Sequence, residues 1–103
     1  MKFVRFLAMD SDKVAAVAQA SDKVWANPPS GVKMLSNHAC LGITFPNQSP
    51  DTIVTIGIME AESPEALTAV SYPLALAGAA VWSVPILDVP VAGATEIEKK
   101  ARG

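Results

Sequence analysis

The only histidine and the only cysteine of the chain, His38 and Cys40, lie two positions apart in the stretch "SNHACLGITF". Side chains of these types can act together as a general base and a nucleophile when the imidazole reaches the sulfur. The surrounding residues predict a strand, in which positions i and i+2 share a face but lie about 7 Å apart. That separation disfavours the hydrogen bond, so we interpret Cys40 as a small apolar side chain of the core.

His38 is the better candidate of the two, because an imidazole exchanges protons near neutral pH without assistance. If its face of the strand looks toward the helices, His38 can bind a small ligand or act as a catalytic acid or base. If it does not, the side chain is held by a backbone carbonyl or lies at a subunit contact. The sequence leaves both interpretations open.

Arg5 raises a similar question, since it stands within an apolar strand between Phe3 and Leu7. A guanidinium in this position can anchor an anionic ligand through two parallel hydrogen bonds. It can also pair with a carboxylate on a neighbouring strand, and Glu60 is the candidate. We favour the pairing with Glu60.

Three aromatic residues complete the predicted set of ligand-binding side chains, which is Arg5, His38, Trp25, Tyr72 and Trp82. The two tryptophans can supply wide apolar walls, and Tyr72 can offer a phenol donor at the mouth of a pocket. One histidine and one cysteine cannot form a structural zinc site within one chain, and the sequence has no glycine-rich phosphate loop. We therefore expect no metal and no cofactor.

The composition predicts one domain over residues 1–103, with residues 92–103 as a short C-terminal helix or tail. Half of the residues are apolar and 17% are charged, against a usual charged share of about 25%. So few charged side chains cover a small monomer poorly, and a second apolar surface is then buried in an oligomer. We expect a homodimer or a higher homo-oligomer.

Charge and cysteine content exclude several classes of partner and compartment. The formal net charge is −2 and the basic residues form no stripe, which argues against nucleic-acid binding. A single cysteine cannot form an internal disulfide, which indicates a cytoplasmic protein. The stretch from Ala66 to Leu87 is uncharged, but Pro73, Gly78 and Pro85 interrupt it. We therefore predict a helix followed by a strand rather than a membrane span.

Hydrophobic periodicity predicts the elements that must position these side chains. Asp10 or Ser11 is expected to cap the first helix, and Ser63 the second. Pro73 is expected to kink or split the second helix, and Gly78 to end it. Pro85 marks the last strand as an edge strand or a bulged one. The predicted strands are residues 2–9, 32–44, 52–62 and 80–87, and the predicted helices are residues 10–27, 63–77 and 92–103.

The order β-α-β-β-α-β predicts an α+β, ferredoxin-like fold. Right-handed crossovers then give a four-stranded antiparallel sheet with both helices on one face. The strands are nevertheless apolar on both alternating faces. The face without helices must meet another apolar surface, and a second copy of the chain is the simplest candidate.

Three stretches carry a resemblance to a known family: "NPPSGVKMLSNHA", "ESPEAL" and "VWSVPILDV". They resemble a small uncharacterised family of the dimeric α-β barrel superfamily, and the likeness covers nearly the whole chain. Members of that superfamily pair two ferredoxin-like sheets face to face. The superfamily includes cofactor-free monooxygenases, lactone isomerases and ligand-sensing domains, so the resemblance implies fold and dimerisation more than one activity.

Three functions follow as alternatives. The first is a homodimer with an apolar cavity in each subunit that binds a small hydrophobic, carbonyl or acid ligand. The second is a cofactor-free enzyme, similar to a monooxygenase or an isomerase, with His38 as acid or base. The third is a structural or interaction subunit whose cavity is filled by its own side chains.

Overall fold

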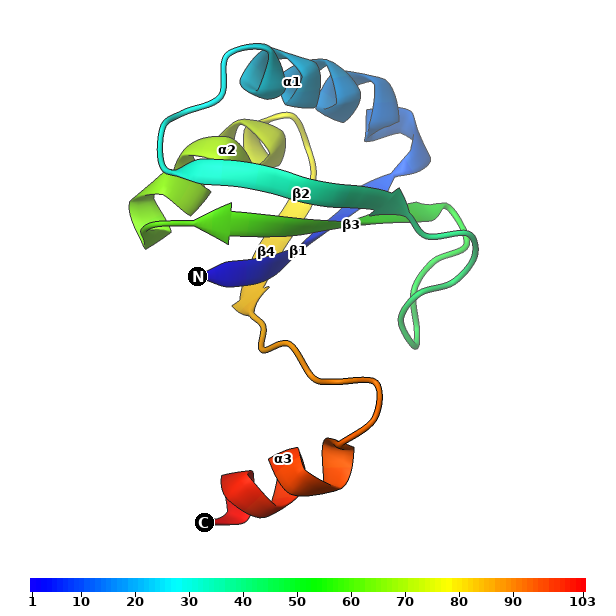
Figure 1. Ribbon diagram of the computed structural model, residues 1–103. Coiled ribbons are helices and arrows are strands. Elements are labelled where there is room, and N and C mark those ends of the chain that lie inside the picture. Colours follow the sequence, from blue (N-terminus) through cyan, green and yellow to red (C-terminus); the bar gives the residue numbers. More distant parts are fainter.

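The chain folds into a four-stranded antiparallel sheet with two helices packed on one of its faces (Figure 1). The computed structural model describes all residues from 1 to 103. The strands lie in the order β2-β3-β1-β4, and every neighbouring pair is antiparallel. The protein is therefore α+β, as predicted. The elements are β1 (Lys2–Asp10), a 3₁₀ turn (Ser11–Lys13), α1 (Val14–Ala26), β2 (Val32–Ala39), β3 (Thr52–Ala61), α2 (Pro64–Leu76), β4 (Ala80–Pro85) and α3 (Ala94–Arg102).

The largest differences from the predicted bounds are at the start of α1 and at the end of β2. Asp10 is the last residue of β1, and its side chain makes no capping hydrogen bond, because the 3₁₀ turn separates the strand from α1. The second strand ends at Ala39 rather than at residue 44. The residues that follow leave the sheet in a long connection to β3.

The second helix begins and ends close to where the sequence indicates, and it is continuous through Pro73. The hydroxyl of Ser63 accepts the N–H of Ala66 at 3.1 Å, and Pro64 occupies the first turn, where no N–H donor is needed. The helix is not split at Pro73, since the carbonyl of Pro73 accepts the N–H of Ala77 at 3.1 Å and the last turn stays bonded. Gly78 ends it with a φ of 118°, which suits glycine.

The covered face of the sheet forms the core together with the two helices. Alternate residues of β1, beginning with Phe3, point toward α1 and α2, and the antiparallel register fixes which residues of β3 and β4 join them. Two apolar clusters result: Leu7, Met9, Val17, Leu74 and Ala79 in one, and Met59, Ala61, Leu67 and Val70 in the other.

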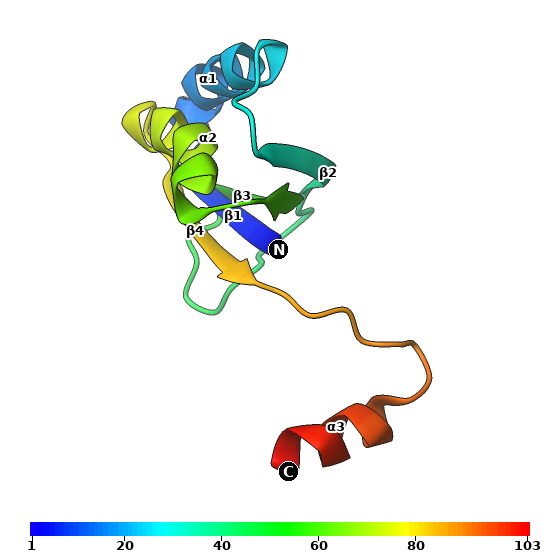
Figure 2. The same cartoon turned by 60° about the vertical axis from the view of Figure 1, so that its left-hand side comes forward.

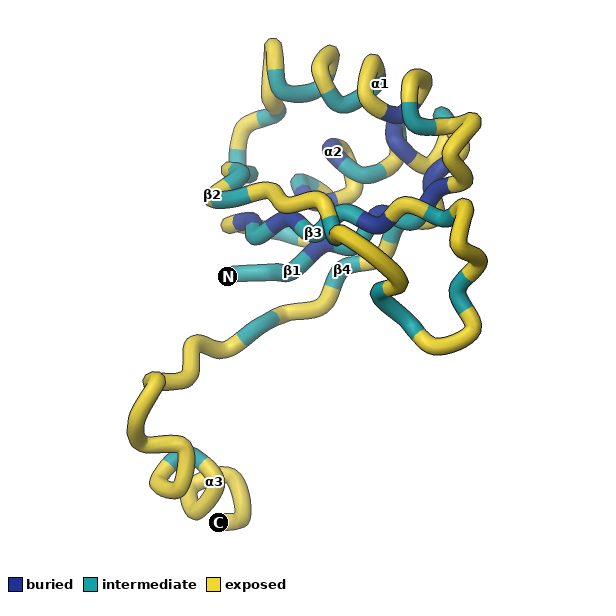
Figure 3. The backbone as a smooth tube through the Cα atoms, turned by 90° about the vertical axis from the view of Figure 1, so that its right-hand side faces the viewer, coloured by how far each residue is buried: buried dark blue, intermediate teal, exposed yellow.

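The opposite face of the sheet, called the open face below, has no helix over it (Figure 2). The register places on it Val4, Phe6 and Ala8 of β1, Val54, Ile56 and Ile58 of β3, and Trp82 and Val84 of β4. Most of these residues are half-buried or exposed. Figure 3 shows buried, half-buried and exposed positions following one another along the strands. The sheet is thus apolar on both sides, as the sequence predicts.

The last part of the chain, residues 86–103, extends away from the sheet and is called the C-terminal arm below. It ends in α3, which stands clear of the other elements in all three views (Figures 1, 2 and 3). The radius of gyration of 15.5 Å exceeds the roughly 13 Å of a compact domain of this length.

No helix is both long enough and apolar enough to cross a membrane.

Candidate functional site

Arg5 is the one charged side chain in the core, and it is 1% exposed. It lies in the middle of β1, opposite Gly57 of β3 and Ser83 of β4, on the face that looks toward the helices. Its Nε and Nη1 are buried without a hydrogen-bond partner. The ion pairs of the protein all involve other groups. Such a guanidinium is rare, because buried charges are normally paired.

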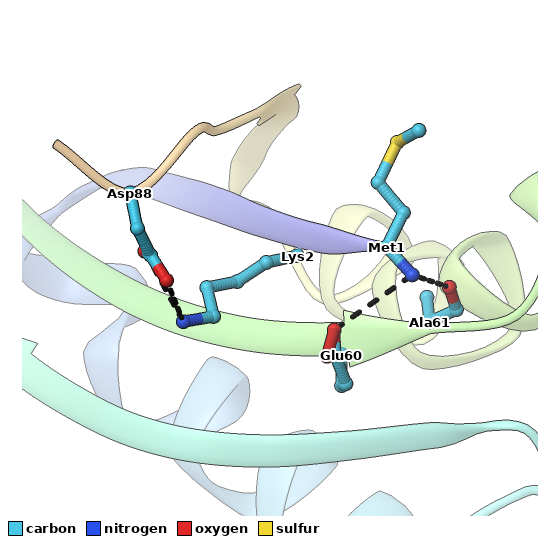
Figure 4. A network of polar contacts seen from close by, with 5 residues as sticks. All are labelled: Met1, Lys2, Glu60, Ala61 and Asp88. Carbon is cyan, nitrogen blue, oxygen red and sulfur yellow. Dashed lines mark hydrogen bonds and ion pairs between the residues drawn. The ribbon is translucent and has the colours of Figure 1, made fainter.

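The predicted pairing of Arg5 with Glu60 is wrong. Glu60 lies opposite Lys2 in the register, so its side chain points to the open face while Arg5 points to the covered one. The carboxylate of Glu60 lies 3.7 Å from the amino group of Met1 (Figure 4). That amino group also donates to the carbonyl of Ala61 at 3.1 Å.

A cavity of about 220 Å³ opens beside Arg5, between the covered face of the sheet and α1. Six of its eleven lining residues are apolar, and the other five are polar or charged. Drug-sized ligands usually occupy about 300–1,000 Å³, so this cavity suits a smaller molecule. Its lining residues are Arg5, Leu7, Met9, Val14, Val17, Ala18, Ser21, Asp22, Asn37, Ile53 and Thr55.

The electrostatics of the cavity are dominated by the desolvated guanidinium. Burial lowers the pKa of Arg5 below its ordinary value, because the charged form loses its hydration. Asp22 lines the same cavity but is exposed, and it forms no ion pair with Arg5. An acceptor that enters the cavity with a negative charge would satisfy the free donors and offset the cost of burial.

His38 lies on the other side of the sheet from this cavity. It pairs with Ile56 in the register, and Ile56 pairs with Phe6, so all three belong to the open face. The imidazole is exposed. Cys40 follows the end of β2 and donates its backbone N–H to the carbonyl of Val54 at 2.9 Å; it is half-buried. The structure therefore separates His38 from Arg5 by the thickness of the sheet.

The three predicted aromatic residues are also kept apart. Trp25 packs against the core cluster that contains Met59, and its indole Nε1 is buried without a partner. Tyr72 is 60% exposed and lines a separate surface hollow along α2. Trp82 belongs to the open face. Of the five side chains predicted to bind ligand, only Arg5 lines the cavity beneath α1.

An aromatic cluster on the open face was not predicted. Phe6 stacks on Trp82 with ring centroids 5.2 Å apart, and Phe45 approaches both at 5.7 and 5.8 Å. Phe45 comes from the loop after β2, where the side chain of Gln48 accepts the N–H groups of Thr44 and Phe45. The turn residues of "FPNQSPD" indicate the loop, but nothing in the sequence indicates its contact with the sheet.

Other site residues that the sequence does not single out are the polar ones around the cavity. Ser21 and Asp22 come from α1, Asn37 from β2 and Thr55 from β3. In the sequence, each of these residues occupies a position where a solvent-exposed polar side chain is common. Only the strand register and the packing of α1 on the sheet bring them together. No group of three or more His, Cys, Asp or Glu side chains is placed to hold a metal ion.

No protein-family model and no curated protein matches the chain. Among solved structures, the C-terminal domain of the MgtC protein from Mycobacterium tuberculosis is similar over 81% of this chain and 84% of that domain. Its TM-score is 0.56 and the identity is 14%.

Two further likenesses carry no argument, because their TM-scores lie below 0.5. A DUF3240 family protein from Shewanella baltica gives a TM-score of 0.42 at 15% identity, covering 89% of this chain and 97% of that one. The NE2512 protein of unknown function from Nitrosomonas europaea gives 0.43 at 16% identity, covering 89% and 95%. The comparison with the MgtC domain shows a shared α+β fold and nothing about function.

Proposed function

We propose that the protein is a binding module for a small organic acid, held in the cavity between α1 and the sheet with its carboxylate on Arg5. The observation that carries this proposal is the buried Arg5, which lines the cavity and whose Nε and Nη1 have no hydrogen-bond partner. A fold has no reason to keep an unpaired charge in its core for stability alone, since apolar residues of the same volume fill such sites at lower cost.

The rest of the wall defines the other half of the ligand. Leu7, Val14, Val17 and Ile53 offer apolar surface, so the ligand carries a compact hydrocarbon or aromatic body beside its acid group. The volume of about 220 Å³ limits that body to a few carbon atoms or a single ring. Ser21, Asn37 and Thr55 are available for one further polar contact.

The same proposal covers the architecture and the assembly. The alternation of strands and helices, with β1 and β3 central, supports one ferredoxin-like domain over residues 1–103. The apolar open face supports a dimer of the α-β barrel type, in which two sheets pack face to face in the cytoplasm. His38 and Trp82 then lie at the subunit contact rather than in the ligand cavity.

Matched pairs of ligands test the proposal. Small carboxylic acids and their neutral amides are added to the protein, and the shift in melting temperature is measured for each member. Acids with a branched or aromatic body are expected to raise the melting temperature, and their amides are not. The variant Arg5→Met should lose the shift, whereas Arg102→Met in the exposed α3 should keep it. Equal shifts with acids and amides, or an unchanged shift in Arg5→Met, would contradict the proposal.

The alternative of a cofactor-free enzyme with His38 as acid or base stays a separate hypothesis. Because His38 faces away from the Arg5 cavity, that reaction would take place on the open face. Turnover that is lost in His38→Ala while binding at Arg5 persists would support it.

A further inference from the structure

The C-terminal arm has the properties of a segment that packs on another molecule. Its helix, α3, has nine residues and none of them is buried. Isolated helices shorter than about 12–15 residues are marginal in water. The ion pairs Glu96–Lys99 and Glu98–Arg102 add only about 0.2–0.5 kcal/mol each. A stable α3 therefore needs a partner surface.

The apolar residues of the arm show which side would meet that surface. Leu87, Val89 and Val91 alternate with other residues along the extended part, and all three are exposed. In α3, the residues Ala94, Ile97 and Ala101 follow at helical spacing and form one stripe. The arm thus offers a continuous apolar edge that nothing in its own chain covers.

The start of the arm is fixed beside the first residues of β1. The N–H of Ile86 donates to the carbonyl of Lys2 at 3.0 Å, and the side chains of Lys2 and Asp88 pair at 3.0 Å (Figure 4). From there the arm runs on the side of the sheet away from α1 and α2, and α3 stands off from the open face (Figures 1 and 2).

The length of the arm is sufficient to reach the rim of a second sheet that packs on the open face. Two packed sheets lie about 10 Å apart, and the five residues 89–93 can span roughly 16 Å. The protein also exposes 6844 Å², about 1,300 Å² more than the roughly 5,500 Å² of a compact monomer of this mass. A standard interface needs only about 800 Å² from each partner.

We infer that the C-terminal arm is exchanged between two copies of the chain, each arm packing its apolar edge on the partner subunit. This inference rests on the proposed face-to-face homodimer and adds the exchange of the two C-terminal arms to it. Leu87, Val89 and Val91 lie against the rim of the partner's open face, and the stripe of α3 continues that contact.

Hydrogen exchange on the full chain tests the arm directly. Amides of α3 are expected to exchange freely below the dissociation constant of the dimer and to become protected above it. The double variant Val89→Asp/Val91→Asp should raise that dissociation constant by at least about tenfold, since it places two charges against apolar surface. The control Ala92→Asp/Thr95→Asp adds the same charge beside the apolar edge and should leave the constant within about threefold of the wild type.

The outcomes separate the inference from the proposal on which it rests. A wild-type protein that is monomeric at every concentration overturns both the dimer and the arm exchange. A wild-type dimer whose α3 stays unprotected, or whose dissociation constant is the same in both double variants, overturns the arm exchange alone. Protection of α3 that appears with vesicles of anionic lipid, and not with protein concentration, would also overturn it.

Discussion

At the scale of single residues, Arg5 is where stability and function oppose each other. Its guanidinium is buried at a cavity wall with free donors, and a ligand carboxylate would satisfy them. Without ligand the protein carries the whole cost of the buried charge. The site is thus organised around one side chain, with the apolar residues of the cavity deciding the shape of what binds.

Replacement of this arginine should therefore stabilise the ligand-free protein. Arg5→Met keeps most of the apolar stem and removes the charge, so the free energy of unfolding should rise by about 1–3 kcal/mol. Urea denaturation measures it, with Arg102→Met as the control, which should change by less than about 0.5 kcal/mol. A loss of stability in Arg5→Met would mean that the guanidinium is satisfied within the folded chain.

The same difference should depend on pH in one direction. Because burial lowers the pKa of Arg5, the folded protein carries the full cost at every pH below the lowered folded value. As the pH rises through the lowered folded value, the wild type loses the charge and gains stability. The stability advantage of Arg5→Met should accordingly be constant below that folded value and shrink as the pH rises through it, which urea denaturation at a series of pH values measures.

His38 illustrates what a sequence can and cannot say about a single residue. Its type marks it as a candidate for acid–base chemistry, but a strand has two faces, and only the register decides between them. The register with Ile56 puts it on the open face. The predicted pairing of Arg5 with Glu60 is wrong for the same reason. The two residues do lie on neighbouring strands, but their side chains point to opposite faces of the sheet.

A substitution at this histidine should leave the cavity intact. His38→Ala is expected to bind a cavity ligand with the affinity of the wild type, because the side chain is on the far side of the sheet. Isothermal titration with an acid found in the melting screen provides the measurement. A tenfold weaker affinity in His38→Ala would show that the two faces are coupled or that the ligand lies elsewhere.

At the scale of elements, local chemistry predicts where α2 begins and ends, but not where α1 begins. Ser63, Pro64 and Gly78 each impose a backbone preference that needs no tertiary context, and α2 starts and stops accordingly. Pro73 does not split α2, which runs through it to Leu76. The contact of the Phe45 loop with the open face could not be predicted from the sequence, because it depends on packing between residues that are distant along the chain.

The N-cap of α2 gives a prediction at this scale. Ser63→Ala removes the acceptor for the N–H of Ala66 and should lower the free energy of unfolding by about 1 kcal/mol. Ser63→Asp should restore it, because a carboxylate also caps and favours the positive end of the helix dipole. Thermal or urea denaturation compares these variants with Ser30→Ala, a change at an exposed serine before β2 that should be neutral.

At the scale of the whole molecule, the two faces of the sheet have separate roles in our account. The covered face holds the core and the cavity, and the open face and the arm hold the second copy. Only 12 of 103 residues are buried, a small core for a chain that is half apolar. Composition alone predicts a need for further burial, whereas only the topology identifies the open face as an apolar surface without a helix over it.

A charge on the open face should therefore break the dimer and spare the fold. Val84→Glu places a carboxylate among apolar side chains at the proposed contact, so the dimer should dissociate at micromolar concentration. Sedimentation velocity measures the mass, and circular dichroism checks that the sheet persists. A variant that stays dimeric would move the interface away from the open face.

The central claim is that a carboxylate binds Arg5 inside the cavity, and a crystal structure with a bound acid tests it most directly. We predict carboxylate oxygens about 2.7–2.9 Å from guanidinium nitrogens of Arg5, with the body of the ligand against Leu7, Val14, Val17 and Ile53. An acid that binds tightly in solution but lies outside this cavity, leaving Nε and Nη1 of Arg5 without an acceptor, would contradict the account.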